Sequence, residues 1–275
     1  MKKLILLLFP LFFSAQTHRF IYQFQYKLDS LAKDFAMENM ILDVNPDDVK
    51  FYPYSYVETD SLNIVRGQSR SRWDDHLPAV IRKKNSFENI SLILLNDFFS
   101  LKSTDKLNWK LLNDTKVDGQ YKLQKATTTF GGRNWIAWFS KDVNLSEGPY
   151  KFRGLPGLIF EIEDDKKNFI FKLSKSMKFS KTYEAKFLES FLGQKPIPVS
   201  EKIIAKKQLE LYSNPLQDIA KSFKANVNPE NTFYVSGVQI KSLDQIKGMS
   251  DERRKTMLRE NNPIEIDKVV KYPLH

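Results

Sequence analysis

The fold is decided by residues 121–173, which read YKLQKATTTFGGRNWIAWFSKDVNLSEGPYKFRGLPGLIFEIEDDKKNFIFKL. Residues 121–130 are strand-like, and Gly131-Gly132-Arg133 is a typical turn sequence. The following residues, 134–139, are apolar on both faces, which is typical of a strand in the middle of a sheet. This half of the stretch therefore predicts a β-hairpin whose second strand is central.

The second half of the stretch predicts another pair of strands. A Gly-Pro pair at 148–149 interrupts the chain, and Leu-Pro-Gly-Leu at 155–158 fits a type II turn. Proline presets the first central position of such a turn, and Gly157 accepts the positive φ of the second. We therefore expect Gly157→Val to destabilise the fold, because valine resists positive φ. Strands at 158–163 and 168–173 follow the turn.

The clearest element before this stretch is a half-buried strand at 19–28. Its alternate residues share one apolar face: Phe20, Tyr22, Phe24, Tyr26 and Leu28. Further strands are predicted at 40–44 and 49–57. Residues 60–84 are polar and basic and predict an exposed loop, with room for an edge strand, whereas residues 89–101 predict a buried element of undecided type.

The last third of the chain predicts helices. Ser200 can cap one helix, Asn214-Pro215 opens a second, and Ser250 opens a third that ends before Asn262-Pro263, with strand-like residues at 232–240. The expected fold class is therefore α+β, with a large, mostly antiparallel sheet and a few helices mainly in the C-terminal third. No repeat or flexible linker is visible, so residues 16–275 are expected to form a single domain.

The first fifteen residues have the layout of a secretory signal peptide. Lys2 and Lys3 precede an apolar run at 4–13, and the small residues Ser14 and Ala15 follow it. A membrane-spanning helix needs roughly 20 apolar residues, so this run is too short to span. We expect cleavage after Ala15 and an exported chain without a transmembrane segment, resident in the periplasm or at the outer membrane or cell surface.

The composition excludes several kinds of chemistry. Cysteine is absent from the 275 residues, which excludes disulfides, thiolate zinc sites, iron–sulfur clusters and cysteine nucleophiles. The three histidines are His18, His76 and His275; the first and last lie near the ends, and His76 is expected in a solvated loop. No glycine-rich phosphate loop or nucleophile motif is present. We therefore expect neither a cofactor nor a metal.

The charged residues suggest calcium binding, glycoside hydrolysis or nucleic-acid binding, but their spacing does not favour any of these functions. Asp43-x-Asn45-x-Asp47 resembles the start of a calcium loop, but Asp48 stands where that loop requires glycine. Carboxylates at 161–165 resemble a glycosidase pair, yet a solvated sheet face explains them as well. The net charge of +10 comes from scattered basic residues, so nucleic acid is not an expected partner. An anionic lipid or lipopolysaccharide surface fits this charge better.

Residues 154–159 spell Gly-Leu-Pro-Gly-Leu-Ile, and the sequence around them resembles the GLPGLI family of exported proteins from Gram-negative bacteria. The likeness includes Lys125-Ala126-Thr127, Gly132-Arg133, Trp138-Phe139, Gly148-Pro149-Tyr150-Lys151-Phe152 and the ending Asn262-Pro263-Ile264-Glu265. The resemblance implies export and association with outer-membrane transport systems, but no assigned activity and no catalytic residues. The sheet with a Gly-Leu-Pro turn also looks similar to periplasmic lipid carriers, which wrap an incomplete barrel over helices.

The resemblance and the residue types together define two sets of residues. Glycine, proline and apolar residues are expected to form a structural motif: Gly148, Pro149, Gly154, Leu155, Pro156, Gly157, Leu158 and Ile159. Basic and aromatic residues nearby are candidates for binding a ligand or a partner: Lys125, Arg133, Trp135, Trp138, Phe139, Lys151 and Arg153.

Three functional hypotheses follow. In the first, the protein is a non-enzymatic binding protein that holds an apolar or amphipathic ligand, such as a lipid, against its aromatic residues, with Arg133, Lys151 and Arg153 at an anionic headgroup. In the second, an exposed Gly-Leu-Pro-Gly turn docks on an outer-membrane transport receptor. The third is a hydrolase, for which the sequence offers no suitable spacing of acids or histidine. If Arg153 binds a partner, Arg153→Ala should leave stability nearly intact.

Overall fold

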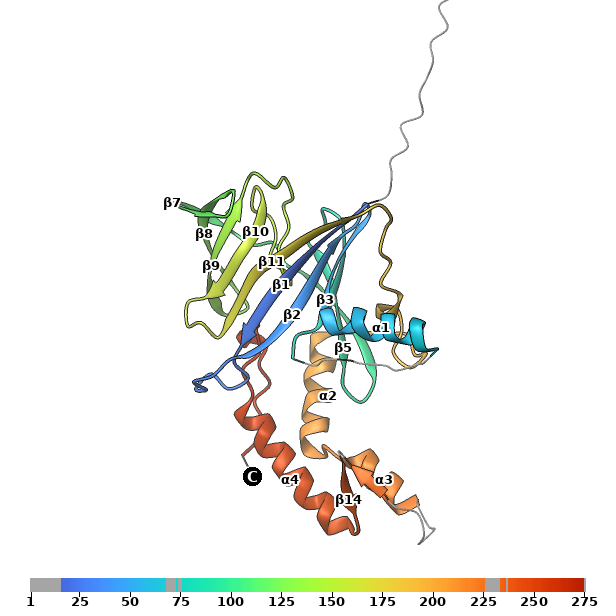
Figure 1. Ribbon diagram of the computed structural model, residues 1–275. Helices are drawn as coiled ribbons and strands as arrows, with labels where there is room; N and C mark the ends of the chain where they lie inside the picture. Colours follow the sequence, from blue (N-terminus) through green and yellow to red (C-terminus); the bar gives the residue numbers. More distant parts are fainter. Residues whose placement is uncertain (1–15, 68–72, 74–75, 226–232, 236, 275) are drawn as a thin grey trace, which may run out of the picture.

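A twelve-stranded, mostly antiparallel sheet forms the body of the protein, and most helices follow it in the chain (Figure 1). These statements hold for the residues that the computed structural model describes, which are 16–67, 73, 76–225, 233–235 and 237–274. The predicted α+β fold class is confirmed. The predicted signal peptide, residues 1–15, lies outside the described residues.

The sheet is built from two meanders that meet at its centre. The first contains β1 (Thr17–Tyr26), β2 (Ala36–Val44), β3 (Asp48–Pro53), β4 (Ala79–Lys83), β5 (Glu88–Leu94) and β6 (Phe98–Thr104). The second contains β7 (Lys110–Asp118), β8 (Tyr121–Phe130), β9 (Arg133–Ser140), β10 (Leu158–Asp164) and β11 (Phe169–Phe179). Strand β11 pairs with β1 and joins the two meanders, while β12 (Ile197–Val199) runs parallel to β6.

The connection between β6 and β7 requires the sheet to curve. In the strand order β7 forms one edge, and β6 lies next to β12 at the opposite edge. Residues 105–109 alone join the two strands. Because a chain spans about 3.5 Å per residue at most, the two edges must approach each other. The sheet is therefore an incomplete barrel with a concave inner face.

The predicted central hairpin is confirmed. Strand β9 pairs with β8 on one side and with β10 on the other. Gly131 and Gly132 connect β8 to β9 with φ values of 62° and 74°. Positive φ at both central residues is the requirement of a type I′ turn, whose twist matches that of the strands. Alternate residues of β9 point inward, and Trp135 and Phe139 are fully buried.

The protein's own chain fills the concave face. The loop at 141–157, between β9 and β10, places Tyr150, Phe152 and Leu155 in the same core cluster as residues of β1, β3 and β4. The rings of Phe152 and Trp135 lie 4.5 Å apart, and Tyr22 Oη on β1 donates to the carbonyl of Ile159 at 2.7 Å. The inner face is thus packed and not open to a ligand along these residues.

The Leu-Pro-Gly-Leu turn differs from the predicted type II turn. The amide of Gly157 donates to the carbonyl of Leu155 at 2.8 Å, which closes a three-residue γ-turn around Pro156. The amide of Leu158, which a type II turn would use, donates instead to Val143 at 3.2 Å. Glycine is still required, because Gly157 has φ +150° and a Cβ there would lie 2.0 Å from the carbonyl oxygen of Ser140.

Two predictions for the first half of the chain need correction. Helix α1 (Tyr54–Arg66) replaces the end of the predicted strand at 49–57 and the start of the predicted loop. Among its residues Tyr56 is buried, whereas Ile64 and Val65 are exposed, so the helix lacks the apolar stripe that would reveal it. Helix α1 and the turn η1 (Lys186–Leu188) pack on the outer face of the sheet.

Residues 89–101, for which a buried element of undecided type was predicted, form the β5–β6 hairpin.

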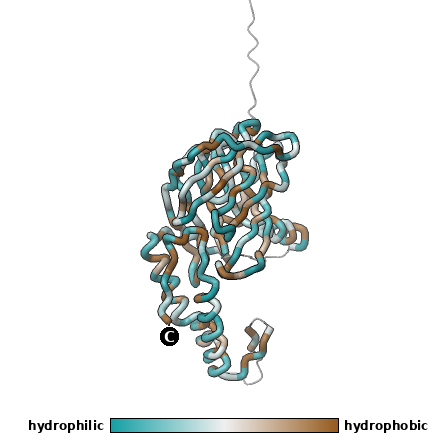
Figure 2. Tube along the Cα trace, turned by 90° about the vertical axis from the view of Figure 1, so that its left-hand side faces the viewer, coloured by the Kyte–Doolittle hydropathy of each residue, from teal (hydrophilic) through white to brown (hydrophobic). Residues whose placement is uncertain are grey.

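The C-terminal elements form a helical arm that extends from one end of the sheet, as Figures 1 and 2 show from two sides. The arm consists of α2 (Glu201–Ser213), α3 (Gln217–Ala225), β13 (Phe233–Val235), β14 (Val238–Ile240) and α4 (Leu243–Arg259). The predicted helix after Ser200 is confirmed. The third helix begins at Leu243 and not near Ser250, because Ser242 Oγ caps it by accepting from the amide of Gln245 at 3.3 Å.

None of the helices in the described part of the chain combines the length and the apolar character that a membrane span requires.

Gly157→Val tests the close approach at the γ-turn. We expect the variant to lose about 3 kcal/mol or more of unfolding free energy, because the side chain collides with the backbone of Ser140. The matched control is Gly119→Val, at φ +56° with open space around its Cβ, which isolates the cost of positive φ, about 1–2 kcal/mol. Equal melting temperatures for the two variants would contradict the role of the Ser140 contact.

Candidate functional site

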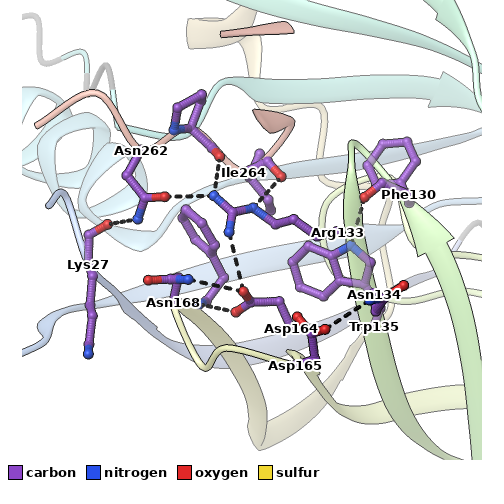
Figure 3. Close-up of polar contacts among 12 residues, drawn as sticks. Lys27, Phe130, Arg133, Asn134, Trp135, Asp164, Asp165, Asn168, Asn262 and Ile264 are labelled. Atoms are coloured by element: carbon purple, nitrogen blue, oxygen red, sulfur yellow. Dashed lines mark hydrogen bonds and ion pairs between the residues drawn. The ribbon is translucent and has the colours of Figure 1, made fainter. Parts of the chain in front are cut away.

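After α4 the chain returns to the end of the sheet as a segment that we call the C-terminal strap, residues 261–272 (Figure 1). Arg133, the first residue of β9, holds this strap (Figure 3). Its guanidinium donates to Asn262 Oδ1 at 2.7 Å, to the carbonyl of Pro263 at 2.8 Å and to the carbonyl of Ile264 at 3.1 Å. One cation thus satisfies three acceptors on a segment distant in the chain.

Asp164 fixes Arg133 from the other side. Its carboxylate is fully buried, lies 3.3 Å from Arg133 Nη1, and accepts from the amide of Phe169 at 2.8 Å (Figure 3). Burial lowers the pKa of Arg133, and the charge of Asp164 and its hydrogen bond oppose that effect. An arginine remains charged under these conditions, so the ion pair persists within the protein.

The C-terminal strap packs directly on the two glycines of the β8–β9 turn. A Cβ on Gly131 would lie 2.8 Å from the Cα of Glu265, and one on Gly132 would lie 2.9 Å from Ile266 Cγ2. The amide of Asp267 donates to the carbonyl of Gly131 at 3.3 Å. Side chains at either glycine would therefore push the strap away, as well as strain the turn.

Glu265 of the strap is the centre of a second buried charge cluster. It accepts from Tyr150 Oη and from Lys151 Nζ, each at 2.6 Å, and from Lys268 Nζ at 2.8 Å. Burial alone would raise the pKa of Glu265, but the charge of Lys151 and the hydrogen bonds from these groups outweigh it and lower the pKa. Burial and the charge of Glu265 raise the pKa of Tyr150, which stays a neutral donor.

A cavity of about 230 Å³ lies beside this cluster, between the β5–β6 hairpin, α2 and the C-terminal strap. Its walls are mostly apolar and include Leu92, Ile93, Leu94, Leu101, Ile204, Ile264 and Val270. Its polar wall contains Lys151, Glu265, Lys268 and Gln208, with Trp73 and His76 also on the lining. Of the seven predicted ligand- or partner-binding candidates, Lys151 is the one that lines this cavity, whose walls are all described residues.

Arg133, Lys151 and Arg153 have internal partners in place of the anionic headgroup expected for them. Each is less than 9% exposed. Arg153 Nε lies 3.3 Å from Glu147 Oε1, its Nη1 donates to the carbonyl of Ser86 at 2.6 Å, and its guanidinium stacks on the ring of Phe87. Glu147 also pairs with Arg82, so one carboxylate joins two arginines from different parts of the chain.

The four remaining candidates lie on two faces of the sheet. Trp135 and Phe139 are inside the core, where Phe152 covers Trp135. Trp138 and Lys125 lie on the outer face, and Lys125 Nζ is 5.9 Å from the indole centroid. Lys116 from β7 is closer, at 4.6 Å. The structure therefore does not bring the seven candidates together at one site.

The predicted structural motif is mostly internal as well. Leu155, Leu158 and Ile159 are at most 1% exposed, whereas Gly154 and Pro156 are exposed. A Cβ on Gly148 would lie 2.7 Å from Ile159 Cδ1. The apolar side chains of this turn thus belong to the core and are not available to a docking receptor.

Other motifs have plain structural roles. Asp43, from the calcium-like motif, forms a buried bidentate ion pair with Arg19 at 2.7 Å. Asp164, from the acidic run, is buried against Arg133, whereas a solvated face had been expected. His76 is exposed at the rim of the cavity, 5.5 Å from the ring of Tyr26. Within the described residues, no group of three acids or histidines can hold a metal ion.

Sequence analysis missed Glu265 and Lys268 as residues of a site, although Glu265 belongs to the ending that supports the resemblance. Its carboxylate meets Lys151 from the Tyr-Lys-Phe part of the same pattern. The sequence did contain an indication of this pair, because each of the two motifs has one residue of opposite charge, Lys151 in the first and Glu265 in the second.

Comparisons with known proteins agree with this fold and identify no activity. Residues 132–161 match the model of a family described as a protein of unknown function (Porph_ging). No curated protein matches the chain. Similar solved structures include PNGF-II in the C2 and P21 space groups, with TM-scores of 0.52 and identities of 14% and 12%. The match covers 70% of this chain and 32% and 33% of those chains, so the likeness shows a shared fold over about a third of PNGF-II.

Arg153→Ala tests whether this buried arginine is structural. We expect a loss of about 3 kcal/mol of unfolding free energy, since the change leaves Glu147 with one cation fewer inside the core. In the control Lys172→Ala the side chain is 60% exposed and bridges Glu161 at 3.5 Å, so we expect a loss below about 1 kcal/mol. Both are measured by thermal unfolding. A melting temperature of Arg153→Ala close to wild type would return this residue to the binding candidates.

The lowered pKa of Glu265 predicts a pH dependence. The folded state favours the ionised carboxylate, so the stabilisation is present above the unfolded pKa, about 4.3, and is lost as the pH falls through the lower folded pKa. Glu265→Gln removes this carboxylate. We expect it to lower the melting temperature at pH 7, and to differ less from wild type near pH 3. An equal difference at both values would contradict the assignment.

Proposed function

We propose that the protein is an exported, non-enzymatic binding protein that holds a small apolar or amphipathic ligand in the cavity between the sheet and the C-terminal strap. The observation that carries the proposal is the composition of the cavity wall, which is apolar along β5, β6, α2 and much of the strap and charged at Lys151, Glu265 and Lys268. Ligand pockets combine a predominantly apolar wall with a few fixed polar groups in this way.

The size of the cavity limits the ligand. Its volume of about 230 Å³ is below the range of roughly 300–1,000 Å³ for pockets that take drug-sized molecules. This volume is the one that about eight water molecules occupy in the liquid, so the cavity holds a ligand of roughly eight to ten non-hydrogen atoms. A complete phospholipid does not fit, whereas one short chain or ring with a polar end does.

The charged residues of the wall support binding more than catalysis. Lys151, Lys268 and Tyr150 all donate to the carboxylate of Glu265. The pKa of Glu265 is lowered and that of Lys268 is raised, so both groups keep their charges at neutral pH. Catalytic acids and bases need pKa values near the working pH. This cluster instead suits a fixed, polar end wall.

We also propose membership of the GLPGLI family, since the hexapeptide at 154–159 lies within the matched range 132–161. Export to the periplasm or the outer membrane is part of the same proposal. It is supported by the signal-like residues 1–15.

A second candidate function is docking on an outer-membrane transport receptor through the helical arm. The observation that favours it is a groove of about 460 Å³ between α3 and α4, whose lining includes Leu216, Leu243, Lys224 and Lys247. Tyr234 on the neighbouring hairpin is 61% exposed. These basic side chains suit an acidic segment of a receptor.

Native mass spectrometry of the mature protein from its own cell envelope tests the first proposal. We expect a discrete bound mass of a small molecule that solvent extraction releases. Gln208→Trp places an indole in the cavity and should remove this mass, whereas Lys206→Trp, at an exposed position of the same helix outside the cavity lining, should retain it.

Two results would decide against the cavity. A bare wild-type mass, together with a specific cross-link from the helical arm to a membrane protein in intact cells, would favour docking. A bound mass that Gln208→Trp retains would show that the ligand lies elsewhere.

A further inference from the structure

Lys268 of the C-terminal strap offers a place for the polar end of the ligand. Lys268 lines the cavity, and its ammonium has two carboxylate partners, Glu201 Oε1 at 2.6 Å and Glu265 Oε2 at 2.8 Å. A lysine ammonium has three N–H donors. Burial would lower the pKa of Lys268, but its hydrogen bonds to both carboxylates raise it, so the group is a cation.

The two carboxylates that bind Lys268 differ in their exposure to solvent and in their other hydrogen bonds. The side chain of Glu265 is 9% exposed, and Tyr150 and Lys151 fix it from the opposite side. The side chain of Glu201 is 55% exposed, at the first residue of α2. An exposed ion pair contributes little to stability, so a competing carboxylate can replace Glu201 at low cost, while Glu265 stays in place.

The charge of the lining favours an anion. Lys151 and Lys268 each bring a positive charge to the wall, and Glu265 brings one negative charge. Lys151 Nζ also lies 3.7 Å from Asp105, which is outside the lining, so the local surplus of positive charge arises at Lys268, which loses one of its two carboxylate partners when Glu201 moves aside. A ligand with a single negative charge balances this surplus, whereas an amine would add to it.

Apolar residues surround the rest of the volume. Leu92, Ile93 and Leu101 come from the β5–β6 hairpin, and Ile204 comes from α2. The cavity holds roughly eight to ten non-hydrogen atoms, and a carboxylate uses three of them, so about five to seven carbons remain for an apolar tail.

We propose, on the basis of the proposed function, that the cavity binds a small monocarboxylic acid. Its carboxylate lies on Lys268 in the place of Glu201, and its hydrocarbon tail lies among β5, β6 and α2. Glu201 then acts as an internal competitor for the ligand. The same site rejects the amine of equal length.

Isothermal titration calorimetry with three eight-carbon probes, octanoate, octan-1-ol and octylamine, tests this proposal on the mature protein. We expect wild type to bind octanoate at least about tenfold more tightly than octan-1-ol, because a hydrogen bond to a charged group is stronger than a neutral one. We expect octylamine to bind more weakly than either.

Two variants distinguish a ligand contact from a structural role. Lys268→Met should reduce the affinity for octanoate to that for octan-1-ol, while the control Lys271→Met, exposed and outside the cavity lining, should bind like wild type. Glu201→Gln should bind octanoate more tightly than wild type, because the competing carboxylate is gone. A merely structural ion pair between Glu201 and Lys268 would not produce a tighter complex.

The outcomes separate this inference from the function on which it rests. Equal affinities for octanoate and octan-1-ol, or weaker octanoate binding by Glu201→Gln, would overturn the carboxylate assignment and leave an apolar ligand in the cavity. Failure of all three probes to bind, with a bare mass from the cell envelope, would overturn both. Should Lys268→Met not fold, the direction of change in Glu201→Gln still decides.

Discussion

A buried charge must find its compensation inside the protein, and Arg133 finds its counter-charge in Asp164 of β10 and its remaining hydrogen-bond acceptors in the C-terminal strap. Its guanidinium is divided between Asp164 and the backbone and amide oxygens of the C-terminal strap. Leaving a member of such a network unpaired costs about 3–5 kcal/mol, a large share of the stability of any domain. The central hairpin and the strap therefore stabilise each other, and the buried cluster around Glu265 lies on the strap that this contact holds.

The need to pair buried charges inside the protein also explains why Lys151 and Arg153, next to the Gly-Leu-Pro-Gly turn, have structural roles. Lys151 and Arg153 were expected to meet an anionic headgroup or partner, which requires them to be accessible. Their loop instead enters the concave face, because a sheet that is nearly closed needs side chains such as Phe152 to fill it. Each cation that enters with it lies against a buried carboxylate, Glu265 for Lys151 and Glu147 for Arg153, and both carboxylates are shared with a second cation.

Local patterns in the sequence predicted the sheet, and contacts distant in the chain limited the prediction. Alternation revealed the face of β1, and Gly131-Gly132 revealed the β8–β9 turn, because both depend on neighbouring residues. Helix α1 was missed since it buries little besides Tyr56, and the turn at Gly157 was assigned wrongly since Val143 accepts the amide of Leu158. The candidate cavity could not be predicted, because its walls come from β5, α2 and the strap, which no local pattern places together.

The position of the cavity connects ligand binding to the attachment of the helical arm. One wall belongs to the sheet, another to α2 at the start of the arm, and a third to the strap that follows α4 at its end (Figure 1). A ligand that contacts all three walls binds only the form in which the strap is seated. Binding to the native state alone stabilises a protein by about 2.7 kcal/mol when the ligand is at 100 times its dissociation constant. Occupancy would thus strengthen the joint between arm and sheet, where Glu265 and Arg133 already hold the strap.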